Sequence, residues 1–545
     1  MRRAALIALV VLLALPAAAF GHATLIRSTP GSSGVVNTPP RTVTLEFSEP
    51  VEARFASVSV TDAPGNQLRD GRPTAEGNTL VVPIKEVGEG WYLVYWRVVS
   101  TDGHPIRGAF TFAVGPNPGP SPEFKIPSIS ETAATPGLVT ARWIVLLAAM
   151  AAIGLFVLRL LTARPAGDLR NVTKAFGVAS AVALVVAPVY LVMSTAQFSL
   201  RSAFDLGEVL PLLDGTEFGK GFIRLELCFA LFVAAAGIAI WLDDPARPRR
   251  TIADLLATTG ALLAAAGVLL IPGTSGHPGT AEPRGLAIVL DAVHLGAGSI
   301  WIGGLIGLLI LWRSRQLALA VRRFSAVALY AVGVLVATGI WASIVHLPTL
   351  ASLWETGYGQ ALLVKMALLV VAVVLAAVNL LRTKTRLLAG ERQSPRFVGG
   401  EVVLIAGAVF AAAIVTSLAP PAKAIAEIGK PAAEVGPGPV DKTVERDGYE
   451  ITFGLTPNRA ATQNQVSIAV RKDGKPVTGA AVTESFAMLD MEMGRQEYEL
   501  TETAPGTYGR ETSALVMAGR WGLTVRVEPP GAEPFTVTVL DHADG

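Results

Sequence analysis

The stretch TARWIVLLAAMAAIGLFVLRLL, residues 140–161, decides the fold of this chain. A helix needs about 20 apolar residues to cross a bilayer, and this stretch supplies them. Seven further stretches have the same character: 175–197, 222–242, 253–272, 286–311, 324–346, 360–381 and 398–418. With 16% charged residues and a mean hydropathy of +0.49, the chain of 545 residues is too apolar for a soluble protein. The sequence predicts an eight-helix transmembrane core over 140–418.

The start of the chain predicts the orientation of these helices. Arg2 and Arg3 precede an apolar segment that ends in Ala19-Phe20-Gly21, the pattern of a signal peptide over residues 1–21. Cleavage there would place His22 first and outside, whereas a cut after Ala18 or Ala23 would make it an ordinary loop residue. Sixteen Lys and Arg then fall in or beside the cytoplasmic loops, against three in the outer loops. We expect a multi-pass protein of the plasma (inner) membrane with both termini extracytoplasmic.

Two modules that read as short strands and turns flank the membrane core. Residues 22–116 contain the strand-like runs 43–47, 91–99 and 109–114, and residues 441–545 contain 449–455, 465–470, 522–527 and 535–539. Linkers rich in Pro, Gly, Ser or Ala cover 117–139 and 419–440. We predict a multi-domain membrane protein with an N-terminal β-sandwich (cupredoxin- or Ig-like) and a C-terminal β-sandwich. The single cysteine, Cys228, excludes an intramolecular disulfide.

The first module carries a set of groups suited to Cu(II). An N-terminal His22 offers a metal its α-amine and its imidazole. Asp102 and His104 share the turn TDGHP, and Glu49 follows a predicted strand. Nitrogen and carboxylate ligands together favour a tetragonal Cu(II) site, although a turn of this kind is more often only a turn.

The motifs of this module resemble the CopC family of periplasmic copper-binding proteins. They are the start His22-Ala23, the segment LEFSEPVE (45–52) and the run 92–114 with its core WRVVSTDGHP. The resemblance implies that Cu(II) is held by four residues: His22, Glu49, Asp102 and His104. Residues 22–116 contain no methionine, so we expect a module that binds Cu(II) alone.

A second resemblance lies in the membrane core. The run DAVHLGAGSIWIGG (291–304), with SGH (275–277), RFS (323–325) and LVKM (363–366), resembles the CopD family of copper-handling membrane proteins. The whole chain therefore resembles a CopC–CopD fusion, for which an eight-helix topology is expected.

Ionisable side chains inside this core are candidates in their own right. At about 1.5 Å per residue, His294 lies about 12 Å into the fifth helix, with Asp291 one turn shallower. Groups at that depth are expensive and usually functional, although the two could simply bond to each other or to a neighbouring helix. With His277 and His346 at outer helix ends, Asp291 and His294 predict a metal-receiving vestibule. Deeper in the membrane, only Asn379 and Glu401 are candidates, so the sequence does not predict the route by which copper would leave.

The last module contains MLDMEM (488–493) and resembles the small YtkA-like β-domains. Alternation along a strand would place Met491 and Met493 on one face, where they could hold Cu(I) together with Met488. Packing in the core is the alternative.

We therefore predict a copper-handling membrane protein that captures Cu(II) outside and passes copper to or across the membrane, in import, homeostasis or resistance. We expect a binder or transporter rather than an enzyme. Its partners would be copper, the lipid bilayer and an external copper donor or cuproprotein acceptor, but no nucleic acid. The alternative is a membrane redox protein, with intramembrane haem or an oxidative copper centre at His22.

Overall fold

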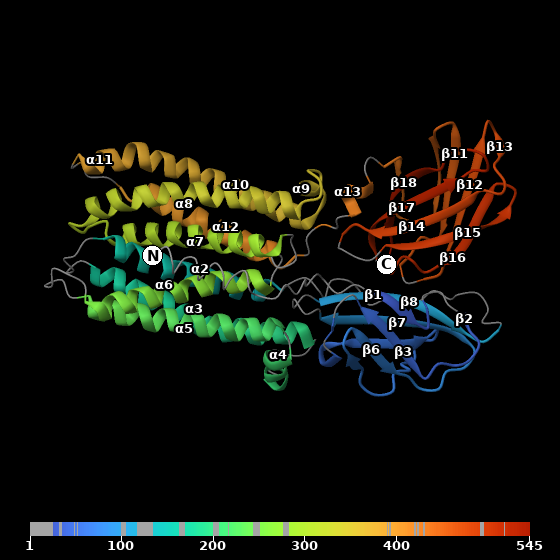
Figure 1. Cartoon of the computed structure of the whole chain (residues 1–545), viewed down its shortest axis with the longest axis horizontal. Helices are drawn as coiled ribbons and strands as arrows, with labels where there is room; N and C mark the ends of the chain where they lie inside the picture. Colours follow the sequence, from blue (N-terminus) through green and yellow to red (C-terminus); the bar gives the residue numbers. More distant parts are fainter. Residues whose placement is uncertain are drawn as a thin grey trace. The chain divides into compact units, whose positions relative to one another are not determined.

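The computed structural model of the chain describes most of both β-rich modules and of the helical core (Figure 1). The described residues are 25–31, 35–47, 50–51, 53–99, 105–116, 135–162, 169–199, 206–215, 217–243, 251–275, 283–389, 391, 394–418, 421, 424–428, 431–460, 462–490, 495–516 and 518–544.

Eight helices in this part of the chain are long and apolar enough to cross a membrane, as predicted. They are α2 (Pro136–Leu161), α3 (Arg170–Ser199), α5 (Glu217–Leu242), α6 (Ile252–Ser275), α7 (Arg284–Ile310), α8 (Leu317–His346), α10 (Gly357–Val378) and α12 (Arg396–Val415). They run alongside one another in Figure 1. Short helices complete the helical part: α4 (Val209–Gly215), α9 (Ser352–Glu355), α11 (Lys384–Leu388) and α13 (Ala424–Ile428).

Helix α8 begins earlier than predicted, at Leu317 rather than at residue 324. The predicted span began after Arg322 and Arg323, which were counted with the preceding cytoplasmic loop. Long cationic side chains are tolerated at the end of a membrane helix because they reach out to polar partners. Here the Arg323 guanidinium donates to the carbonyl of Leu161 at 2.8 Å.

Helix α7 lies at the centre of the bundle. Of the most apolar 18-residue stretch of α7, 56% is buried inside the protein, whereas the corresponding share is 6% for the span Gly357–Leu387, which includes α10. It packs closely against α2: a Cβ atom added to Gly154 of α2 would lie only 2.7 Å from the Cα atom of Gly303 in α7. Trp301 and Phe156 are buried in the core beside this crossing. Small residues therefore let the backbones of α2 and α7 approach, as is common between membrane helices.

The N-terminal module is a β-sandwich, as predicted. One sheet has the order β1 (Leu25–Thr29), β3 (Thr42–Phe47), β6 (Thr79–Pro83) and β5 (Thr74–Glu76). The other has the order β2 (Val35–Val36), β8 (Pro105–Val114), β7 (Gly90–Val99) and β4 (Ser57–Asp62). Alternate residues of both sheets, such as Leu45, Val94 and Phe110, are fully buried in one core between them.

The C-terminal module is a ten-stranded sheet that folds over one core. Its order is β10 (Val440–Arg446), β11 (Tyr449–Thr456), β12 (Asn464–Lys472), β16 (Thr507–Thr512), β15 (Gln496–Ala504), β14 (Ala481–Met488), β17 (Gly519–Glu528), β18 (Phe535–Ala543) and β9 (Ala433–Glu434), with β13 (Lys475–Pro476) paired to β12. Strand β15 pairs with both β14 and β16, which joins the two halves. The core takes Phe453 and Ile468 from one half and Phe486 and Val525 from the other.

Candidate metal centre

Several strand ends meet at one end of the N-terminal sandwich. At the start of β1, Leu25 pairs with Phe47 at the end of β3. The Phe47 ring packs edge-on against Trp96, with 5.3 Å between ring centroids, close to the end of β7. There Val99 pairs with Pro105 of β8. The start of β1, the end of β3, the end of β7 and the start of β8 therefore share this end of the module.

The four ligands predicted for this module, His22, Glu49, Asp102 and His104, lie outside the described residues. In sequence, these four residues adjoin the start of β1, the end of β3, the end of β7 and the start of β8. The ligand set stays a prediction.

In the membrane core, His294 of α7 is held by the neighbouring helix α8. Its Nδ1 atom lies 2.9 Å from the Oγ1 atom of Thr338. The Thr338 hydroxyl also lies 2.7 Å from the carbonyl of Val334 in its own helix, and the direction of its bond to His294 depends on the tautomer of the imidazole. An imidazole protonated at Nδ1 would donate to Thr338 and keep the lone pair of its Nε2 atom for a metal.

Glycines on both neighbouring helices make room for this pair of side chains. A Cβ added to Gly273 of α6 would lie 3.4 Å from the Oδ2 atom of Asp291. A Cβ added to Gly339 of α8 would lie 3.4 Å from the Cε1 atom of His294. Asp291 and His294 are thus inserted between α6 and α8, one helical turn apart on α7.

Lys365 of α10 is a further charged group at this site. It interacts electrostatically with both Asp291 and His294. Sequence reasoning quoted this lysine within the motif LVKM but did not count it as a site residue. A lone lysine in an apolar span was the available signal, because such a charge is rarely without a role.

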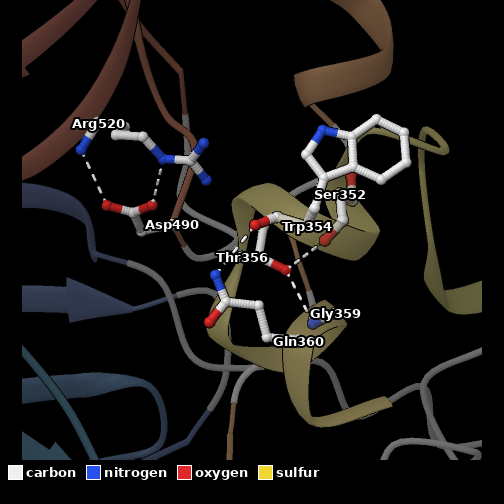
Figure 2. A network of polar contacts seen from close by, with 7 residues as sticks. All are labelled: Ser352, Trp354, Thr356, Gly359, Gln360, Asp490 and Arg520. Carbon is white, nitrogen blue, oxygen red and sulfur yellow. Dashed lines mark hydrogen bonds and ion pairs between the residues drawn. The ribbon is translucent and has the colours of Figure 1, made fainter. Parts of the chain in front are cut away.

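The helix that carries Lys365 has a well-formed start (Figure 2). The Thr356 hydroxyl accepts from the Gly359 amide at 3.0 Å and donates to the Ser352 carbonyl at 2.7 Å. This capping joins α9 to α10, and the Gln360 amide donates to the carbonyl of Trp354 across the same turn.

The other two residues predicted for the vestibule are His277 and His346. His277 lies outside the described residues. The ring of His346 contacts the Ala342 carbonyl through Nδ1 at 2.9 Å. At about 1.5 Å per residue, His346 lies about 12 Å along α8 from Thr338. Among the described residues, no group of three or more His, Cys, Asp or Glu is close enough to hold a metal ion.

The methionine segment of the C-terminal module is only partly described. Met488 is 3% exposed and belongs to the core at the end of β14. Strand β14 ends at Met488, so Leu489 and Asp490 lie beyond it. The chain turns there because the Asp490 carboxylate accepts from the Arg520 backbone at 2.8 Å and from its side chain at 2.9 Å (Figure 2). Met491 and Met493 lie outside the described residues.

Comparisons with known families cover most of the chain. Residues 25–115 match the CopC domain, 132–278 match the N-terminal domain of copper resistance protein D-like proteins, 318–415 match copper resistance protein D and 443–526 match YtkA-like proteins.

Individual relatives agree with these matches. The chain is 29% identical over 542 residues to copper transport protein CutJ of Bacillus subtilis (strain 168), covering 95% of each chain. It is 35% identical over 107 residues to copper resistance protein C of Xanthomonas campestris pv. juglandis, covering 18% of this chain and 84% of the relative. The crystal structure of CopC from Methylosinus trichosporium OB3b matches with 27% identity and a TM-score of 0.17, covering 19% of this chain and all of that one (100%).

Proposed function

Because this chain belongs to the CopC family and joins its CopC domain to a CopD-type membrane domain and a YtkA-like domain, we propose that it moves copper from outside the cell into or across the membrane. It is a multi-pass membrane protein, and its role is copper handling. The single observation that carries the transfer step is the contact of the His294 imidazole with Thr338 of the neighbouring helix, which orients the ring for metal binding through its Nε2 atom.

Capture takes place at the N-terminal module as Cu(II), through His22, Glu49, Asp102 and His104. Two features support this assignment. The four residues occupy the positions of the CopC-type motifs, and in sequence they adjoin described strand ends that share one end of the sandwich. The α-amine of a processed His22 completes a ligand set rich in nitrogen, which Cu(II) prefers.

Transfer into the membrane uses the α7 pair. Copper passes from the outer module to His294, with Asp291 as the carboxylate that offsets its charge and His277 and His346 at the entrance. Lys365 is the cation that keeps Asp291 compensated while no copper is bound, because an isolated carboxylate in a membrane core is costly.

The orientation follows from the distribution of cations. Lys and Arg are concentrated in the loops assigned to the cytoplasm, so both termini and the CopC-type module face outside the plasma (inner) membrane. Binders on the outside favour import, with an external copper donor as partner. The activity is binding and transport rather than catalysis.

Uptake of mass-labelled copper into membrane vesicles of known orientation tests this function. Wild-type protein should accumulate copper from the outer side, and His294→Ala should abolish accumulation without loss of expression. Leu295→Ala is the matched control, since it changes the next residue at the same depth. Equal behaviour of both variants would remove His294 from the route. Absence of uptake together with haem absorbance in the purified protein would favour the redox alternative.

A further inference from the structure

A buried carboxylate occupies the half of the bundle that lies beyond His294. Glu401 of α12 is 2% exposed. Its carboxylate accepts a hydrogen bond from the side-chain amide of Asn379 and another from the indole of Trp301. Three chain segments thus converge on one carboxylate: α12, the end of α10 and α7.

Asn379 brings a second oxygen to this place. Its amide nitrogen is committed to Glu401. Its Oδ1 atom is buried and accepts no hydrogen bond from the described residues. A buried acceptor without a donor is costly unless something else supplies one, which points to a ligand or water at this atom.

A cavity with about 180 Å³ of water-accessible space adjoins both side chains. Its walls are mostly apolar, and its polar groups include Glu401, Asn379, Ser325 and Lys384. One water molecule takes up about 30 Å³ of liquid, so the cavity has room for an ion with several waters.

The backbone at Asn379 is also unusual. The α-helical part of α10 ends at Val378, and Asn379–Thr383 forms a π-helical turn. Such turns are rare inside helices and occur frequently at functional sites. The wider turn begins at Asn379, the residue whose side chain bonds Glu401.

The position of Trp301 connects this group to the α7 pair. Trp301 follows His294 by two helical turns, so the two residues lie on nearly the same face of α7, about 10 Å apart along its axis. A cation that leaves His294 inward along this face reaches Trp301 and Glu401.

We propose that Glu401 and Asn379 form a second cation site, which receives copper from His294 and releases it on the cytoplasmic side. This inference rests on the proposed function. The carboxylate and amide oxygens neutralise the ion and replace part of its water. Oxygen donors hold copper less tightly than imidazole does, and a site from which an ion must leave has to bind weakly.

The test uses the full-length protein in vesicles of known orientation and measures both copper binding at the outer side and copper accumulation inside. Glu401→Gln keeps the size of the side chain but removes its charge. We expect outer binding to stay unchanged while the accumulation rate falls about tenfold or more, because the ion loses its counter-charge in the membrane. Glu401→Asp should retain part of the rate. Val403→Leu is the matched control, because Val403 lies on the same helix and is 71% exposed, and this variant should behave as wild type.

The outcomes separate this inference from the proposed function. Wild-type vesicles that accumulate no copper would refute the function itself. Wild-type accumulation with an equal rate in Glu401→Gln would overturn only the second site. Should Glu401→Gln fail to fold, Asn379→Asp replaces it. An added carboxylate is expected to hold copper longer and to slow its release about tenfold, and an unchanged rate would overturn the second site.

Discussion

His294 and Thr338 are joined by a contact of 2.9 Å between the Nδ1 and Oγ1 atoms, on two helices that are adjacent in the bundle. The Thr338 hydroxyl is itself tied to the Val334 carbonyl of its own helix. The contact therefore restricts the rotation of the imidazole ring. This is the arrangement by which proteins commonly orient a histidine that binds a metal.

Replacing Thr338 should weaken the metal site without removing a ligand. Thr338→Val keeps the shape of the side chain but removes the hydrogen-bond partner of His294, so the imidazole ring can turn. Loss of such a supporting bond typically costs about 10- to 100-fold in metal affinity. Copper accumulation in vesicles at limiting copper concentration measures the effect. Thr338→Ser retains the hydroxyl and should stay near wild type. Equal accumulation by the valine and serine variants would contradict the proposed role.

The free α-amine of His22 should be essential for Cu(II) capture. In full-length protein with a processed N-terminus, one extra residue placed before His22 moves the amine out of the ligand set. We expect a sharp loss of Cu(II) affinity and an EPR spectrum with fewer nitrogen ligands. Glu52→Gln, a change near but outside the predicted ligands, serves as the control. Unchanged affinity after the extension would mean that His22 binds copper, if at all, through its ring alone.

The methionines of the C-terminal module should matter only for Cu(I). Thioethers are soft ligands and favour Cu(I) strongly over Cu(II). A Met491→Leu/Met493→Leu double variant keeps volume and apolarity nearly constant, so the fold should survive. We expect it to lose Cu(I) binding measured under reducing conditions. Full Cu(I) affinity in the double variant would return both residues to a packing role, the role that Met488 already has in the core.

The C-terminal module should become less stable as the pH rises. Burial and, to a lesser extent, nearby Asp541 raise the pKa of Glu484 to about 8. Burial also raises the pKa of Asp541 to about 6. In the unfolded chain such carboxyls lose their protons at about pH 4. Between that pH and about 8 the folded state therefore binds more protons than the unfolded state, and stability falls.

Thermal unfolding of residues 431–545 at pH 5 and pH 8 measures this dependence, since the module has a core of its own. We expect a higher Tm at pH 5. Glu484→Gln should reduce the difference because its amide does not ionise. The exposed Glu499→Gln should leave the difference unchanged. A Tm that rises with pH in the wild-type module would refute the assignment.

The eight spans could be read from the sequence because crossing a bilayer depends on length and apolarity, which are local properties. The sandwich of the first module was equally accessible, since its alternation and turns are also local. The ends of the helices were harder to predict from the sequence. Arg322 and Arg323 break the apolar pattern of α8 but not its helix, because Leu161 on another helix supplies a partner for Arg323.

The sequence by itself determined which residues are candidates: His294 and Asp291 stand out wherever they are placed, because a membrane core seldom tolerates ionisable groups. Only the tertiary structure decided what those residues meet. Thr338 bonds to the ring of His294, Lys365 comes within electrostatic reach of Asp291, and Asn379 bonds to Glu401 beside a cavity. The two members of each pair lie on different helices. The apolar pattern of one helix does not show which side chains of a neighbouring helix will contact it. The packing of the helices, which small residues such as Gly154 and Gly303 allow, determines these contacts.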